Sequence, residues 1–141
     1  MVHIPDYLVD KRLSVKRKDY QSYIEHFMND KKPYLKPCFT LQEMASMTGI
    51  NVPALSAFIN QAHQMNFNEF VNMYRVNYFK SLLELPEYHH WTLEAVAYKA
   101  GFNSRTTFIR SFTRCCGCTP REYFKLLRVH NKCNCCRRML L

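Results

Sequence analysis

The sequence predicts an all-α fold in which two helix-turn-helix subdomains are joined by a long central helix. Apolar residues recur at helical spacing along most of the chain, and one helix-turn-helix pattern occurs twice, about fifty residues apart. Uninterrupted helical periodicity fills the interval between the two copies. The 141 residues, 48% of them apolar, suit one domain or two small subdomains that share a core.

The N-terminal part of the chain predicts an amphipathic helix that precedes the repeated pattern. Aromatic and aliphatic residues from Tyr20 to Met28 follow the i, i+3, i+4 spacing, which places a helix over about residues 19–29. Pro33 is expected to end it. Residues 1–37 are therefore interpreted as an N-terminal extension that carries one helix.

The first copy of the pattern occupies residues 38–67. Thr40 and Glu43 have the spacing of a capping box, in which each residue satisfies a free backbone N–H group at the start of a helix. That helix is expected to end at Gly49. Asn51 then predicts the start of a second helix, and Leu55 and Ile59 are among its inward positions.

The second copy, with its closing helix, occupies residues 91–128. Thr92 is expected to cap its first helix and Gly101 to end it, after which Ser104 leads into a second helix. Phe108 and Phe112 take the inward positions there. Ala45 and Ala97 each lie four residues before the turn glycine of their copy, where two helices that cross closely require a small side chain. A closing helix is predicted from Pro120, after a Thr119 cap.

Residues 68–90 are interpreted as a linker helix and a loop. The helix is predicted to run from an Asn68 cap to Leu85, a length of ~27 Å at 1.5 Å per residue. A rod of this length suits two helix-turn-helix units that enter successive major grooves of one DNA duplex, about 34 Å apart, without dimerisation.

The net charge of +9 is unevenly distributed along the chain. Residues 1–35 carry +2, residues 36–90 carry −1 and residues 91–141 carry +8, counted as Lys and Arg minus Asp and Glu. A basic excess of this kind indicates a polyanionic partner, most often nucleic acid, or a surface that is merely solvated. The second copy of the pattern lies in the positive third.

Several classes of protein are disfavoured by the composition. No apolar run approaches the ~18 residues of a membrane span, and the N-terminus has no long apolar stretch of the secretory type, so a cytoplasmic protein is expected. Seven cysteines, an odd number, favour reduced thiols. The histidines and carboxylates form no catalytic or metal-binding pattern, so neither an enzyme nor a cofactor is expected.

The segment from Ala97 to Phe124, AYKAGFNSRTTFIRSFTRCCGCTPREYF, resembles the signature of the DNA-binding domain of AraC/XylS-type transcription regulators. The residues that match this signature at the same spacing are Gly101-Phe102, Phe112, Gly117, Pro120 and Tyr123. The resemblance extends from about Tyr34 to Arg128. It implies a bacterial regulator that binds double-stranded DNA, and it favours activation through RNA polymerase. Family members usually join this domain to a sensory module, but the residues before the first copy are too few for a small-molecule pocket, so no small-molecule ligand is expected in this chain. No membrane partner is expected either, because no apolar run is long enough to cross a bilayer.

The first copy departs from this family at one point. Family members commonly have a glycine that closes the first recognition helix, and this chain has His63-Gln64-Met65-Asn66. Asn66 is expected to adopt the left-handed cap in its place.

Alignment of the two copies predicts which side chains read DNA bases. The outward positions are Pro53, Ser56, Ala57 and Asn60 in the first copy, and Arg105, Thr106, Ile109 and Arg110 in the second. An arginine can donate two N–H groups to guanine O6 and N7, which contributes about 1–3 kcal/mol of discrimination. The first copy offers no comparable group, so the second is expected to dominate. The predicted phosphate contacts are Ser104, Arg114, Arg121 and Lys125.

Two alternative interpretations remain open. A helical protein-interaction module would suit the uncharged outward face of the first copy. A zinc-binding variant would use Cys115-Cys116-Gly117-Cys118 with Cys133-Asn134-Cys135-Cys136, although the helix between these pairs argues against it. Residues 129–141 are interpreted as a basic, cysteine-rich tail without fixed structure. The protein is either a stand-alone regulator, a piece of a larger one, or a partner of a protein that supplies the signal.

Overall fold

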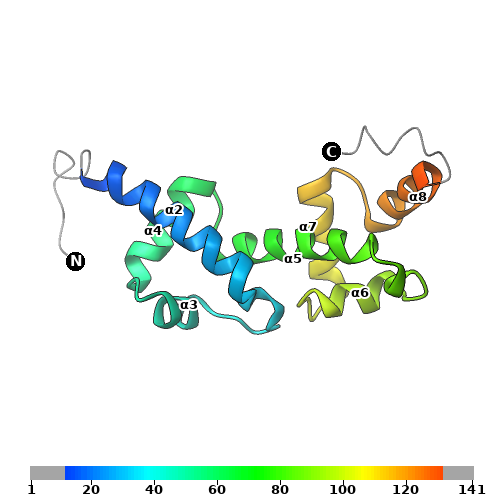
Figure 1. The fold of residues 1–141 in the computed structure, drawn as a ribbon, viewed down its shortest axis with the longest axis horizontal. Helices are drawn as coiled ribbons and strands as arrows, with labels where there is room; N and C mark the ends of the chain where they lie inside the picture. The colour runs from blue at the N-terminus through cyan, green and yellow to red at the C-terminus, as the bar shows by residue number, and fades with distance from the viewer. Residues whose placement is uncertain (1–11, 132–141) are drawn as a thin grey trace. The chain divides into compact units, whose positions relative to one another are not determined.

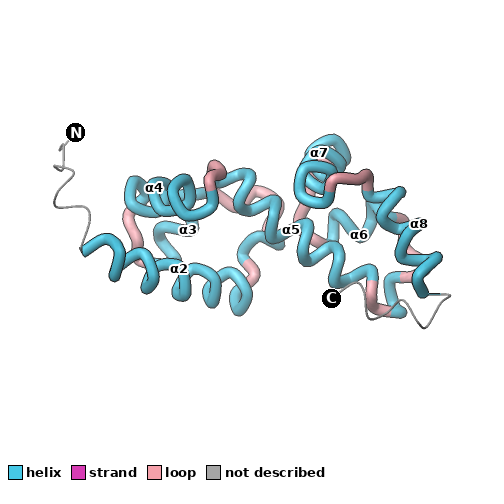
Figure 2. Tube along the Cα trace, turned by 90° about the horizontal axis from the view of Figure 1, so that it is seen from above, coloured by secondary structure: helices cyan, strands magenta, loops and turns pink. Residues whose placement is uncertain are grey.

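The computed structural model describes residues 12–131 and the side chains of residues 19–129. This part of the chain contains seven α-helices, two short 3-10 helices and no strand, which confirms the predicted all-α class (Figures 1 and 2). In chain order the elements are α2 (Arg12–Lys31), η1 (Pro33–Leu35), α3 (Leu41–Thr48), α4 (Val52–His63), α5 (Phe67–Leu83), η2 (Pro86–Tyr88), α6 (Leu93–Lys99), α7 (Arg105–Cys116) and α8 (Pro120–Asn131).

The chain folds as two compact units that divide within α5, between Val71 and Asn72. In the first unit α4 packs against both α2 and α3. Its most deeply buried side chains are Ile24, Met28, Met44, Leu55, Ile59 and Phe70. At its margin, the ring of Tyr20 meets that of Phe58 edge to face, with 6.2 Å between their centroids.

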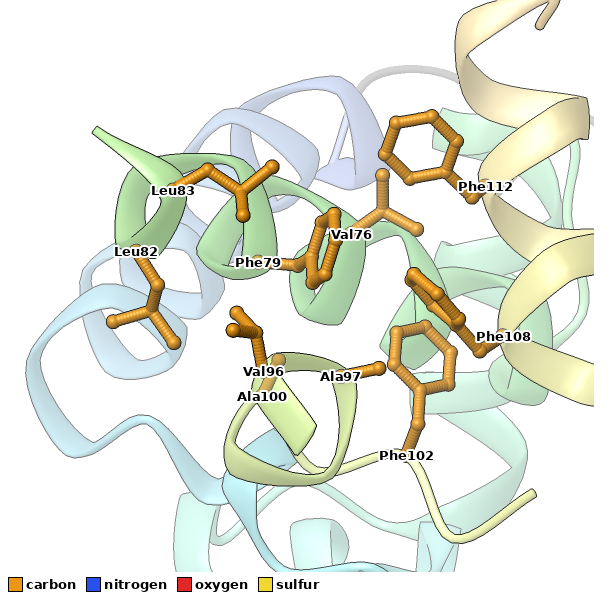
Figure 3. Close-up of a cluster of buried hydrophobic side chains, with 10 residues drawn as sticks. All are labelled: Val76, Phe79, Leu82, Leu83, Val96, Ala97, Ala100, Phe102, Phe108 and Phe112. Atoms are coloured by element: carbon orange, nitrogen blue, oxygen red, sulfur yellow. The ribbon is translucent and has the colours of Figure 1, made fainter. Parts of the chain in front are cut away.

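The second unit is built around an aromatic core (Figure 3). The ring of Phe79 of α5 packs against both inward phenylalanines of α7, with its centroid 4.7 Å from that of Phe108 and 5.6 Å from that of Phe112. Val96 and Ala97 of α6, with Ala100 at its C-cap, complete the core. Both α6 and α8 pack against α7. The expected inward positions Phe108 and Phe112 are thus confirmed by burial.

The predicted helix ends are largely confirmed. The Thr40 and Glu43 capping box is present, and Gly49 ends α3 in the left-handed conformation with φ 73°. Thr92 and Asn51 accept hydrogen bonds from backbone N–H groups as N-caps. Gly101, with φ 103°, follows the last turn of α6, where the Phe102 N–H donates to the Ala97 carbonyl. This 6→1 bond is that of a Schellman motif, which requires a residue with positive φ.

The end of α4 differs from the prediction. Gln64, not Asn66, adopts the left-handed conformation, with φ 54° and ψ 38°. Asn66 instead caps α5: its side-chain oxygen accepts from the Glu69 N–H at 2.9 Å, and the Glu69 carboxylate accepts from the Asn66 N–H at 3.0 Å. The predicted Asn68 cap was therefore wrong. A reciprocal capping box satisfies two free N–H groups, which is why it determines where α5 begins.

Two further helix bounds differ. Helix α2 begins at Arg12 rather than near Asp19. Lysine and arginine have good helix propensity, so the basic sequence before Asp19 allows a helix without an apolar repeat. Helix α5 ends at Leu83 rather than at Leu85. Leu85 precedes Pro86 and is extended, with ψ 131°, because the proline ring clashes with a helical residue before it.

The internal repeat is longer than the sequence pattern indicated. Ile24 and Phe27 of α2, shifted by the 52 residues that relate the two copies, coincide with Val76 and Phe79 of α5, and all four side chains are buried. Each copy is therefore three helices long: α2, α3 and α4 correspond to α5, α6 and α7. The helix interpreted as an N-terminal extension is the first helix of the first copy.

The strained residue at the end of α4 gives a stability prediction. Gln64→Gly should raise the free energy of unfolding by about 0.5–1 kcal/mol, because glycine adopts positive φ without the steric cost that a side chain incurs. Chemical denaturation measures the change. The matched control is Ala57→Gly, at an exposed position with helical φ in the same helix, which should lower stability by about 1 kcal/mol. A loss of stability in both variants would contradict the prediction.

Candidate nucleic-acid interface

The outer face of α7 is determined by its inner face. Phe108 and Phe112 are buried, and the ring of Phe108 also lies 5.2 Å from that of Phe102 in the preceding turn. Because residues three or four apart lie on one side of a helix, the opposite side is left to the solvent. The predicted base-reading residues of this helix are all exposed: Arg105, Thr106, Ile109 and Arg110.

The two arginines of this face are not engaged elsewhere in the described part of the chain. Arg105 and Arg110 make no hydrogen bond or ion pair with the described side chains, those of residues 19–129. Their guanidinium groups therefore keep all of their N–H donors available for an external acceptor. A fork of donors on an exposed helix suits the paired acceptors at the edge of guanine in the major groove.

Helix α4 presents a different face. Leu55, Phe58 and Ile59 are buried, whereas Pro53, Ala57 and Asn60 are exposed and Ser56 is half-buried. Its twelve residues include no Lys, Arg, Asp or Glu, whereas α7 carries three arginines. Phe58 was not among the expected inward positions, although it lies three residues after Leu55 on the same side of the helix; its ring also meets that of Tyr20 from α2.

Ser104 has a structural role at the start of α7. Its hydroxyl oxygen accepts a hydrogen bond from the Thr107 N–H at 3.4 Å, so it is the N-cap of the helix. The hydroxyl hydrogen is not used in this bond and can still be donated to a phosphate oxygen. The N–H groups of the first turn of α7 point toward the N-terminal end of the helix, and the start of a helix attracts anions.

The remaining predicted phosphate contacts lie at the end of α7 and along α8. Arg114, Arg121 and Lys125 are all exposed, and Arg121 and Lys125 are four residues apart on α8, so they share one side of that helix. Helix α8 begins with a reciprocal capping box between Thr119 and Glu122. The backbone N–H of Thr119 holds the pKa of the Glu122 carboxyl below its ordinary value.

Two of the four described cysteines contribute to the packing of the second unit. Cys116 and Cys118 are half-buried against its aromatic core, and Cys115 is exposed. Burial raises the pKa of the Cys115 and Cys116 thiols, so neither is a ready thiolate at neutral pH. Within residues 12–131, no three His, Cys, Asp or Glu side chains are grouped as metal ligands would be. Cys133, Cys135 and Cys136, like the rest of the predicted tail from residue 132 on, lie outside the described residues.

None of the helices between residues 12 and 131 is both long enough and apolar enough to cross a membrane.

A family model for the helix-turn-helix domain of AraC-type proteins matches residues 44–126, a range that includes both α4 and α7. This chain belongs to the AraC-type helix-turn-helix family. It is accordingly a DNA-binding transcription regulator of that type, and the resemblance seen in the sequence is confirmed. No curated protein matches the chain.

Two solved structures share the fold. One is a protein of unknown function from Listeria innocua, 24% identical, with a TM-score of 0.59; the match covers 76% of this chain and 95% of that one. The other is the C-terminal domain of AraT, a response regulator from Geobacillus stearothermophilus, 20% identical, with a TM-score of 0.55, covering 74% of this chain and 84% of that domain. At these identities the similarity shows the fold alone.

The cap of α7 gives a prediction about folding. Ser104→Ala should lower the free energy of unfolding by about 0.5–1 kcal/mol, because the Thr107 N–H loses its acceptor. Ser104→Asp, which also caps well, should retain the stability of the wild type. Thermal or chemical denaturation compares the three proteins. Equal losses in both variants would show that Ser104 does not act as a cap.

Proposed function

We propose that this chain is a sequence-specific regulator that binds two successive major grooves of B-DNA as a monomer, with α7 supplying most of the base reading. The observation that carries the proposal is the exposed face of α7, on which Arg105 and Arg110 have no partner in the described part of the chain. Thr106 and Ile109 lie beside them and suit a polar base edge and a thymine methyl group respectively.

On this proposal, α4 contributes a second and weaker set of contacts. Ser56 and Asn60 offer hydrogen bonds, Ala57 suits a thymine methyl group, and Pro53 packs near the start of the helix. None of these is charged, so their contribution to affinity is smaller than that of a bidentate arginine. The net charge is +8 in residues 91–141 and −1 in residues 36–90, which also favours a larger contribution to DNA affinity from α7 than from α4.

Helix α5 supports binding by a single chain. Its seventeen residues correspond to about 25 Å of helix, which is shorter than, but of the same order as, the ~34 Å between successive major grooves on one face of the duplex. Ser104, Arg114, Arg121 and Lys125 are proposed to hold phosphate groups, which fixes the register without specifying sequence. Activation through RNA polymerase in a bacterial cytoplasm is the role that the family favours.

A helical protein-interaction module is the second candidate, and the uncharged outer face of α4 favours it. The two functions differ in their dependence on salt. DNA binding weakens steeply as salt rises, because bound counterions are released, whereas an apolar contact between helices changes little. The probe for this comparison is a duplex selected by the wild-type protein from random sequences.

Two substitutions, compared at the same salt concentration, test whether α7 contributes more to base reading than α4. Arg110→Ala should weaken binding to the selected duplex by about 5- to 100-fold, because a bidentate contact with guanine is lost. Asn60→Ala should weaken it less. Fluorescence anisotropy with a labelled duplex gives both affinities. An equal or larger loss from Asn60→Ala would refute the dominance of the second unit.

Phosphate contacts are tested by the dependence of affinity on salt. Arg121→Ala and Lys125→Ala should each weaken binding to selected and unrelated duplexes by the same factor, and should reduce the slope of log affinity against log salt by about one. Lys31→Ala, at an exposed lysine of α2 with no assigned DNA contact, is the matched control and should leave the slope unchanged. A slope unchanged in all three variants would mean that Arg121 and Lys125 are surface charges only.

A further inference from the structure

Arg75 is the one charged side chain among residues 19–129 that is buried, with 7% of its surface exposed. A buried guanidinium group is costly unless its N–H groups are hydrogen-bonded. Among the described residues, no buried side-chain nitrogen or oxygen lacks a partner. One N–H of Arg75 donates to Oδ1 of Asn72, one turn earlier on α5, at 3.0 Å. The side chain is thus held in place, and the sequence pattern assigned it no role at the DNA interface.

The guanidinium group of Arg75 faces the turn that precedes α7. Its central carbon lies 5.9 Å from the centroid of the Phe102 ring, within the range of a cation–π contact. Phe102 follows Gly101 in the turn and is 1% exposed. Figure 3 shows its ring beside that of Phe108, the first inward residue of α7. Arg75 therefore contacts the turn three residues before Arg105.

The first unit has a corresponding side chain. Tyr23 of α2, shifted by 52 residues, coincides with Arg75 of α5. The Tyr23 hydroxyl donates to the carbonyl oxygen of Thr48 at 3.1 Å, directly before the turn glycine of that unit. Both hydrogen bonds are part-buried, but the side chains that donate them differ: Tyr23 is 47% exposed, whereas Arg75 is 7% exposed and also lies over an aromatic ring. The larger exposure of Tyr23 leaves its side chain less restrained by packing than that of Arg75.

We propose that Arg75 is a positioning residue for base reading by α7. Held by Asn72 and placed over Phe102, it fixes the turn and with it the direction in which α7 presents Arg105 and Arg110. Tyr23 has the same role for α4, with a smaller effect. This inference rests on the proposed function, since it requires that the two arginines of α7 read bases.

The test replaces Arg75 by methionine, which has a similar length but no N–H groups and no charge. Arg75→Met should weaken binding to the duplex selected by the wild type by about tenfold, and binding to an unrelated duplex of the same length by less than about twofold. The salt slope should stay unchanged, because no phosphate contact is lost. A slope reduced by about one would show that Arg75 itself contacts a phosphate and would overturn the proposal.

A double-mutant cycle separates positioning from general stability. In an Arg105→Ala/Arg110→Ala background, Arg75→Met should cause less than about twofold further loss for the selected duplex, because the groups it positions are gone. If Arg75→Met weakens binding to the selected duplex by the same factor in this background as in the wild type, the proposal is overturned. If Arg105→Ala/Arg110→Ala leaves binding to the selected duplex unchanged, the proposed function fails, whatever the effect of Arg75→Met.

Milder variants keep the test decisive if Arg75→Met does not fold. Asn72→Ala removes only the acceptor that orients Arg75 and should reduce the ratio of selected to unrelated binding by about threefold. Tyr23→Phe, which removes only the hydroxyl donor of the corresponding contact, should reduce that ratio by less than about twofold. Thermal unfolding confirms that each variant is folded at the assay temperature. A folded Asn72→Ala protein with an unchanged ratio would overturn the proposal.

Discussion

The contact between α5 and α7, made by Phe79 with Phe108 and Phe112, is the interaction on which the candidate interface depends. Aromatic rings at these separations bury large apolar areas and prefer tilted or edge-to-face geometry, so they restrict the rotation of α7 about its own axis. A helix with its inner face fixed has its outer face fixed as well. Exposure of Arg105 and Arg110 is therefore a consequence of where the phenylalanines lie.

The two units use one three-helix plan and differ in chemistry. Both have a side chain that caps each helix of the helix-turn-helix, a glycine in the turn, and a contact from the preceding helix to that turn. The second unit places three arginines on its second helix and a buried guanidinium group behind its turn. The first unit has an uncharged second helix and a half-exposed tyrosine in the corresponding place. Divergence of this kind preserves the scaffold, because packing restricts the inward positions and leaves the outward positions free to change.

Helix ends show where local chemistry decides the structure and where it does not. Thr40 with Glu43, and Thr119 with Glu122, form reciprocal caps within four residues, so the sequence alone is enough to predict them. Asn66 offered two roles, as the left-handed end of α4 or as the cap of α5. Asn66 caps α5 because Glu69 completes the capping box. The strained left-handed conformation at the end of α4 is therefore adopted by Gln64.

The sequence by itself determined the helical class, the turn glycines, most caps and the outward residues of α7, because each follows from spacing within about ten residues. It also determined the repeat, because both copies keep the same local spacing. Tertiary structure decided what depends on partners distant along the chain. The ring of Phe58 meets that of Tyr20 from α2, a contact between residues far apart in the chain. The role of α2 as the first helix of a repeat appears only when its buried residues are compared with those of α5. The burial of Arg75 against Phe102, 27 residues later, could not be read from spacing, because a charged residue on a helix is ordinarily exposed.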